Sequence, residues 1–168
     1  MLKPQDLLVA LYAATHEGGQ TFAQMAAHLH LGLSTAHTAY QSAKEARLLG
    51  PDGHPDKQRI ADFTVYGAPV AYPGRVGGRI RGVRTAWTAA PIDGLFAIPS
   101  GQHYVWPDRK GDTRGLSLEP IHRAAVGISR SCGKIYAILA LIDIIRVGGA
   151  RERGVAAEQI YHQIGVGY

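Results

Sequence analysis

Between residues 33 and 47 the chain carries hydrogen-bonding side chains of the kind that can read DNA bases. Alanines and Tyr40 recur there at helical spacing and would form the inner face of a helix, which leaves the polar side chains outside. Short or flexible donors and acceptors near a helix N-terminus can reach base edges in the major groove. We therefore expect base contacts from Ser34, Thr35, His37, Thr38 and Gln41. The alternative is an ordinary helical hairpin with a solvated outer face.

Two short helices joined by a tight turn would position these side chains. Thr21 is a candidate N-cap for the first helix, and Gln24 follows at the spacing of a capping box. Gly32 can adopt the positive φ that a sharp turn between helices needs. Ser34 would then cap a second helix, which we expect from Thr35 to about Arg47.

Two more helices are expected to flank this pair, one from Pro4 to about His16 and one from Lys57 to Tyr66, ended by Gly67. The Gly, Pro and Asp residues at 50–56 indicate a turn, with room for only a stub of β-structure. Residues 1–67 are thus predicted to form a winged helix-turn-helix domain. Lys44, Lys57 and Arg59 would bind DNA phosphates beside the recognition helix, which is the helix expected from Thr35 to about Arg47.

The positive charge of the chain lies mostly outside this domain. The net charge is +5, but residues 1–67 hold five Lys or Arg against six Asp or Glu. Residues 68–116 hold seven against three, and residues 117–168 hold six against four. Because phosphate contacts usually dominate the affinity for nucleic acid, we expect the middle segment to help through Arg79, Arg81 and Arg84.

The middle segment, 68–116, is rich in Gly, Pro and Arg and is predicted to contain strands at 70–72, 79–87 and 103–106. A weak internal repeat runs through it: Tyr72–Val83 and Trp106–Leu116 both read aromatic-Pro-x-Arg-x-Gly, then Arg-Gly-apolar. Each copy would be a turn with an exposed arginine and a glycine for close approach, or the likeness arises by chance. Arginines among aromatic residues suit DNA or RNA contact with stacking, an acidic protein partner, or simple coverage of the aromatic rings.

Residues 117–168 are expected to be helical, with helices over 118–129, 133–147 and 150–164. The helix at 133–147 is apolar nearly all round, so it is either the core of this region or a dimer face. The chain as a whole is therefore predicted to be mainly α with a small β-containing middle segment, an α+β fold.

The sequence gives little support for catalysis or metal binding. Cys132 is the only cysteine, which excludes an internal disulfide and a cysteine-based zinc site. The histidines lack metal-ligand spacing, and no phosphate-binding loop or nucleophile elbow is present. We expect no enzyme activity, metal or cofactor. The N-terminus does not read as a signal peptide and the apolar run 135–145 is short and contains Asp143, so a cytoplasmic protein without membrane contact is expected.

Several stretches together resemble bacterial winged helix-turn-helix transcriptional regulators of MarR-like label, some of them similar to AbiEi-type antitoxins. They are LKPQDLLVAL, LGLSTAHTAYQSAKEARLL, VYGAPVAYPGRVGG, RGVRTAW, YVWPDRKGDTRGLSLEPI and ALIDIIRVGGARERGVAAEQI. The resemblance implies a recognition helix over 34–47 and double-stranded DNA as partner. We expect a dimeric, repressor-like regulator whose homodimer is set by the apolar C-terminal helix. The alternatives are an antitoxin module that neutralises a nucleotidyltransferase-like toxin, and an RNA-binding module.

Overall fold

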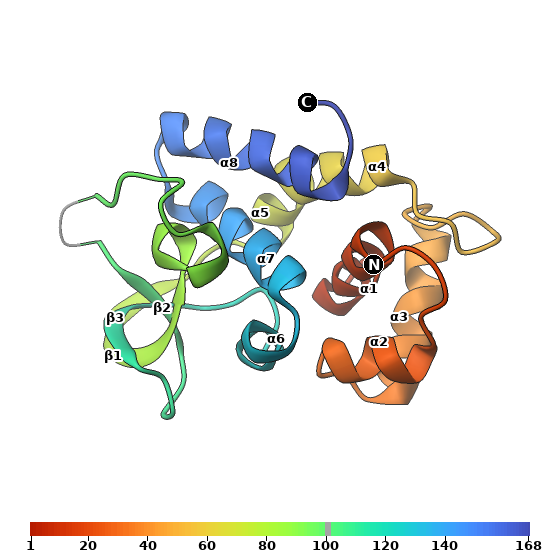
Figure 1. Ribbon diagram of the computed structural model, residues 1–168, viewed down its shortest axis with the longest axis horizontal. Helices are drawn as coiled ribbons and strands as arrows, with labels where there is room; N and C mark the ends of the chain where they lie inside the picture. The colour runs from red at the N-terminus through yellow and green to blue at the C-terminus, as the bar shows by residue number, and fades with distance from the viewer. Residues whose placement is uncertain (100–101) are drawn as a thin grey trace.

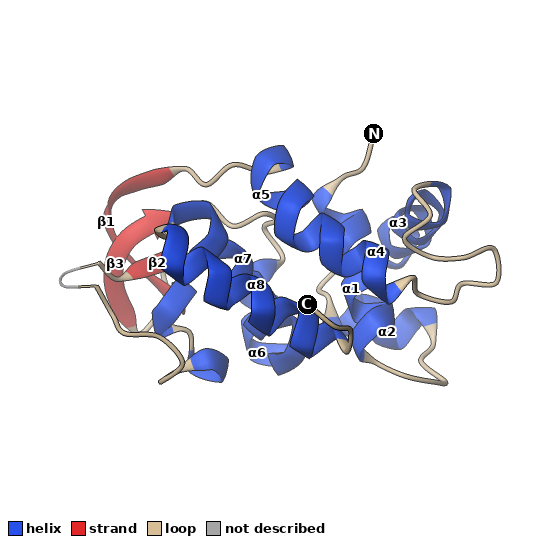
Figure 2. Ribbon diagram, turned by 90° about the horizontal axis from the view of Figure 1, so that it is seen from above, coloured by secondary structure: helices blue, strands red, loops and turns tan. Residues whose placement is uncertain are grey.

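Helices make up most of the computed structural model, which describes residues 1–99 and 102–168 and has the α+β composition expected (Figure 1). A three-stranded sheet lies at one end of the molecule, and helices α2 (Phe22–His28) and α3 (Leu33–Glu45) lie at the other (Figure 2). Between them, α1 (Pro4–Thr15) and α7 (Gly133–Val147) supply much of the core.

The N-terminal helices form largely as expected. Thr21 and Gln24 make the predicted capping box, in which the Thr21 hydroxyl accepts from the backbone N–H of Gln24. The predicted cap at Ser34 is wrong: α3 begins at Leu33 after an extended Gly32, so Ser34 lies within its first turn. The positive φ between the two helices is taken by His30 (φ +50°) and not by Gly32.

After residue 49 the chain makes a turn in which Leu49 and Pro55 form one antiparallel bridge, the stub that was predicted. Helix α4 (Lys57–Asp62) then continues through a π-helical segment (Phe63–Gly67) into α5 (Ala68–Ala71). The predicted stop at Gly67 and the strand at 70–72 are therefore wrong. A Cβ on Gly67 would lie 2.4 Å from the Phe63 ring, so this glycine lets the ring pack against a continuing helix.

The sheet is a small closed barrel of β1 (Val76–Thr85), β2 (Tyr104–Pro107) and β3 (Thr113–Leu118). Strand β1 pairs antiparallel with both others, and β2 pairs parallel with β3. The first two strands confirm predictions, whereas β3 was missed and overturns the helix start at residue 118. Closure brings backbones very near: a Cβ on Gly82 would lie 2.0 Å from the carbonyl oxygen of Trp106.

The two copies of the predicted repeat have different structures. The first leads into β1, while the second forms the end of β2 and the turn to β3. Their Arg-Gly pairs do lie side by side, with Arg81 opposite Arg114, and the glycines do permit close backbone approach.

The C-terminal helices are α6 (Ala125–Ser131), α7 and α8 (Ala150–Ile164). Two short 3-10 helices, Ala86–Thr88 and Ala90–Ile92, also pack against α7. Residues 135–144 are all buried within the single chain, so α7 is a core helix and the predicted dimer face on it is wrong. One hydrophobic core extends from Leu7 to Ile164, through all three segments of the predicted division.

A buried ion pair ties the barrel to α7. The Asp143 carboxylate accepts hydrogen bonds from Thr85 Oγ1 (2.6 Å), Trp106 Nε1 (2.8 Å) and the Arg146 guanidinium (2.7 Å). Arg146 also donates to the carbonyls of residues 72, 73 and 119. The side chains of Asp143 and Arg146 are each only 2 % exposed.

In the described part of the chain, none of the helices is long and apolar enough to span a membrane.

Candidate nucleic-acid interface

Helix α3 presents its polar side chains to solvent. Ala36, Ala39 and Ala43 are buried and pack towards α1 and α2, which lets the helix lie close to its neighbours. The residues predicted to contact bases are all exposed: Ser34, Thr35, His37, Thr38 and Gln41. The structure thus keeps these five side chains together on one accessible helix at the end of the molecule remote from the barrel (Figure 2).

An aromatic contact fixes part of this face. The His37 ring stacks on Phe22 of α2, with centroids 4.1 Å apart, and Phe22 meets Tyr40 edge-on at 4.9 Å. The sequence predicted that His37 lies on the outer face of the helix and contacts bases. Its ring is also supported by the preceding helix, which fixes where its nitrogens can donate or accept.

A groove of about 870 Å³ runs beside α3, between this helix and the turn at 50–56. It brings together three predicted residues, Gln41, Lys44 and Arg59, and adds Arg47 and His54, which the sequence reasoning missed. Arg47 follows the end of α3 with φ +60°, a conformation that helical periodicity does not reveal.

The groove has a modest positive charge. Lys44, Arg47 and Arg59 outnumber Glu45 and Asp56 among its lining residues. The Arg59 guanidinium lies 3.4 Å from the Asp56 carboxylate in an exposed pair, and such pairs are weak enough for the cation to exchange partners. The groove therefore suits an anionic partner that also offers hydrogen-bonding groups to Gln41.

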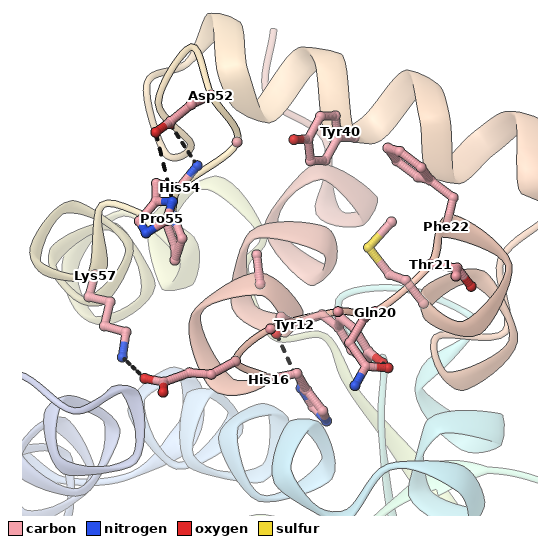
Figure 3. A pocket seen from close by; sticks show the side chains of 16 residues that line it. Tyr12, His16, Gln20, Thr21, Phe22, Tyr40, Asp52, His54, Pro55 and Lys57 are labelled. Atoms are coloured by element: carbon pink, nitrogen blue, oxygen red, sulfur yellow. Dashed lines mark hydrogen bonds and ion pairs between the residues drawn. The ribbon is translucent and has the colours of Figure 1, made fainter.

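Four of the predicted phosphate-binding residues do not join this groove. Lys57 points to another cavity and pairs with Glu17 at 3.2 Å (Figure 3). Arg79, Arg81 and Arg84 lie on β1 at the opposite end of the molecule (Figure 1). Arg84 lies 3.6 Å from Asp112, and Arg81 donates to the carbonyl of residue 111.

Three aromatic residues in or directly beside the barrel cannot stack on bases in this structure. Trp87, Tyr104 and Trp106 are buried, and the Trp87 indole donates to the carbonyl of Gln102. Their burial argues against stacking of bases on these three rings, whereas Tyr72, the fourth aromatic residue among the arginines, is only partly buried.

Other candidate chemistry is sparse. The Cys132 thiol is buried and lies 3.7 Å from His16 Nε2, a contact between residues too far apart in the chain for motif reading to detect. Across residues 1–99 and 102–168, no group of three or more His, Cys, Asp or Glu side chains could hold a metal ion.

Comparisons of this chain with protein-family models, with curated proteins and with solved structures found no match.

Proposed function

We propose that this chain is a sequence-specific, double-stranded DNA-binding transcriptional regulator that reads bases with α3. In this proposal α1, α2, α3 and the turn at 49–55 form a winged helix-turn-helix with a reduced wing. The observation that carries it is the exposed polar face of α3, which continues directly into the basic groove beside it.

The chemistry of the face fits a major groove. The 13 residues of α3 span about 20 Å at ~1.5 Å per residue, and a major groove about 12 Å wide admits such a helix. The Gln41 side-chain amide could pair with an adenine through its oxygen as acceptor and its NH₂ group as donor, while Thr35 and Thr38 offer a hydroxyl to base edges and a methyl group to thymine. Lys44, Arg47 and Arg59 would bind the flanking phosphates.

The phosphate contacts set a measurable salt dependence. Three cations per protomer give a slope of log affinity against log salt of about −3 on duplex DNA. A homodimer would double this slope and place two α3 helices one DNA turn apart. Since α7 is buried, the dimer contact would lie on another surface.

The experiment starts from a pool of random duplexes, because the operator is unknown. Bound duplexes are selected, sequenced and titrated by fluorescence anisotropy at several salt concentrations. We expect Thr38→Ala with Gln41→Ala to abolish the preference for the selected sequence while leaving weaker, salt-sensitive binding. Lys44→Gln should weaken binding to all sequences and reduce the salt slope by about one.

Arg79→Gln in the barrel is the matched control and should leave both measurements unchanged. Absence of duplex binding at low salt would refute the proposal, as would a sequence preference that survives loss of Thr38 and Gln41. Light scattering of the free chain and of the complex tests the homodimer.

A second candidate function rests on the other end of the molecule. Val76 and Ile80 on β1 are 50 % and 42 % exposed, next to Arg79 and Arg81. Apolar side chains between arginines suit a protein partner with an acidic rim, as an antitoxin role would require. Co-purification with the product of a neighbouring gene, lost in Arg79→Glu with Arg81→Glu but not in Thr38→Ala, would support it. Failure to co-purify would count against it.

A further inference from the structure

We propose that the cavity beneath α3 binds a planar aromatic ring that carries a cationic alkylamine. The cavity has a volume of about 690 Å³, within the range of about 300–1,000 Å³ typical of small-molecule sites. It lies between α1, the loop to α2, α3 and the turn at 50–55 (Figure 3). Its apolar lining is formed by Tyr12, Phe22, Met25 and Tyr40.

The aromatic lining is held in place before any ligand arrives. The Tyr12 hydroxyl bonds to His28 Nδ1 (2.7 Å) and Gln20 (3.2 Å), and its ring stacks on His16 at 4.0 Å. Phe22 is held between His37 and Tyr40. Rings fixed by their neighbours lose little freedom on binding a flat ligand, and their faces attract cations.

The polar residues around the cavity favour a positive charge. Glu17 and Asp52 line it with side chains 84 % and 72 % exposed, as expected at a mouth. Lys57 also lines it, and its ammonium is already paired with Glu17 at 3.2 Å. Burial lowers the pKa of His16, so this imidazole is neutral at pH 7. Among the lining residues, two carboxylates and one ammonium leave a negative balance, which favours an amine over an acid. The Lys44 ammonium lies 5.7 Å from the centroid of the Tyr40 ring, so a cation stacked on that ring must replace it.

The cavity shares a wall with the groove beside α3. His54 and Pro55 line both. Tyr40 reaches from α3 to the turn, where a Cβ on Gly53 would lie 1.9 Å from its hydroxyl oxygen. Because the Tyr40 hydroxyl lies directly against the backbone of Gly53, a ligand that shifts the Tyr40 ring would also press on the turn that lines the groove. If the chain binds DNA as proposed above, movement of this turn should lower its affinity for DNA when the ligand is bound.

The test uses 1-naphthylmethylamine and 1-naphthoic acid as matched probes, titrated into the full chain by calorimetry without DNA. We expect saturable binding of the amine, at least about tenfold tighter than binding of the acid, since Glu17 and Asp52 place two carboxylates at the mouth of the cavity, where, among the described residues, they are paired only with Lys57 and with His54. Glu17→Gln with Asp52→Asn should weaken amine binding about fivefold and reduce the preference over the acid. Glu45→Gln, which removes an exposed acid outside the cavity, is the control and should change nothing.

Phe22→Leu keeps an apolar side chain but removes an aromatic face, and should weaken amine binding about threefold. If this variant does not fold, the exposed pair Glu17 and Asp52 still decides the outcome. Binding of the acid as tight as that of the amine, or an unchanged amine affinity in the charge variant, would overturn the site.

The regulatory step is read separately. Saturating amine should weaken binding of the selected duplex at least about threefold, and the Glu17→Gln/Asp52→Asn variant should lose this effect at the same amine concentration. If the chain binds the amine but binds no DNA, the binding site is supported and the proposed function is refuted. If the chain binds the amine but its affinity for DNA is unchanged, the binding site is supported and its coupling to DNA binding is refuted.

Discussion

Replacing Asp143 by asparagine tests how the barrel is held to the helical body. Whichever way the amide is turned, its NH₂ group must face a donor: either the Arg146 guanidinium, or Thr85 and Trp106. Both orientations leave the Arg146 guanidinium, which is only 2 % exposed, without its counter-charge, and the first also turns the NH₂ group towards it. The second leaves the buried Trp106 N–H unpaired.

The magnitude follows from these partners. Removing one member of a buried ion pair costs about 3–5 kcal/mol, and an unsatisfied buried donor costs about 1–3 kcal/mol. We expect Asp143→Asn to lower the free energy of unfolding by about 3–5 kcal/mol. Urea titration followed by far-UV circular dichroism and by tryptophan fluorescence measures it, and the indole of Trp106 reports the contact directly.

Asp112→Asn is the matched control, because Asp112 pairs with Arg84 at 3.6 Å on the surface and its side chain is 76 % exposed. Such a pair contributes at most about 1 kcal/mol. If Asp143→Asn costs no more than Asp112→Asn, the ion pair does not fasten the barrel and the reasoning is wrong.

Two further predictions concern the barrel and pH. Gly82→Ala places a Cβ 2.0 Å from the carbonyl oxygen of Trp106, so we expect the free energy of unfolding, measured by urea titration, to fall by about 1–3 kcal/mol. Gly78→Ala, where a Cβ meets nothing within 4 Å, should be near neutral, and equal effects would contradict the close approach. Burial lowers the pKa of His122 below its usual 6.5, and its Nδ1 accepts from the N–H of Ala124, which only the neutral ring can do. The unfolded chain then binds more protons, so this contribution is complete above pH 6.5 and is lost as the pH falls through 6.5 towards the lowered value. His122→Asn keeps an acceptor without titrating and should flatten the decline of the melting temperature from pH 7.5 to 5.5; an unchanged slope would count against this assignment.

Local patterns predicted the helices well where the signal is contained in the element itself. The bounds of α7 and α8 follow from apolar periodicity between glycines, and the Thr21 cap follows from a spacing of three residues. The exposed face of α3 could likewise be predicted, because its alanines mark the buried side.

The sequence-based predictions are wrong where the local structure depends on residues far away in the chain. Gly67 resembles a helix stop, but the Phe63 ring uses its missing Cβ for packing. Strand β3 has few strand-forming residues and exists because β1 and β2 both pair with it. Lys57 turns away from the groove because Glu17, forty positions earlier, lies within 3.2 Å. The aromatic cavity collects residues from 12 to 57 and has no sequence signature.

The burial of α1 has a consequence for synthesis. Residues 6–12 of this helix are all buried, against partners that include α3, α4, α7 and α8. A nascent chain that has emerged only as far as α4 can already pack α1 against α3 and α4, but it leaves exposed the part of α1 that α7 and α8 cover later. The end that carries α2 and α3 is made first, but the last partners of α1 arrive only with α7 and α8, so we expect a fragment ending after residue 67 to be less stable and less soluble than the full chain.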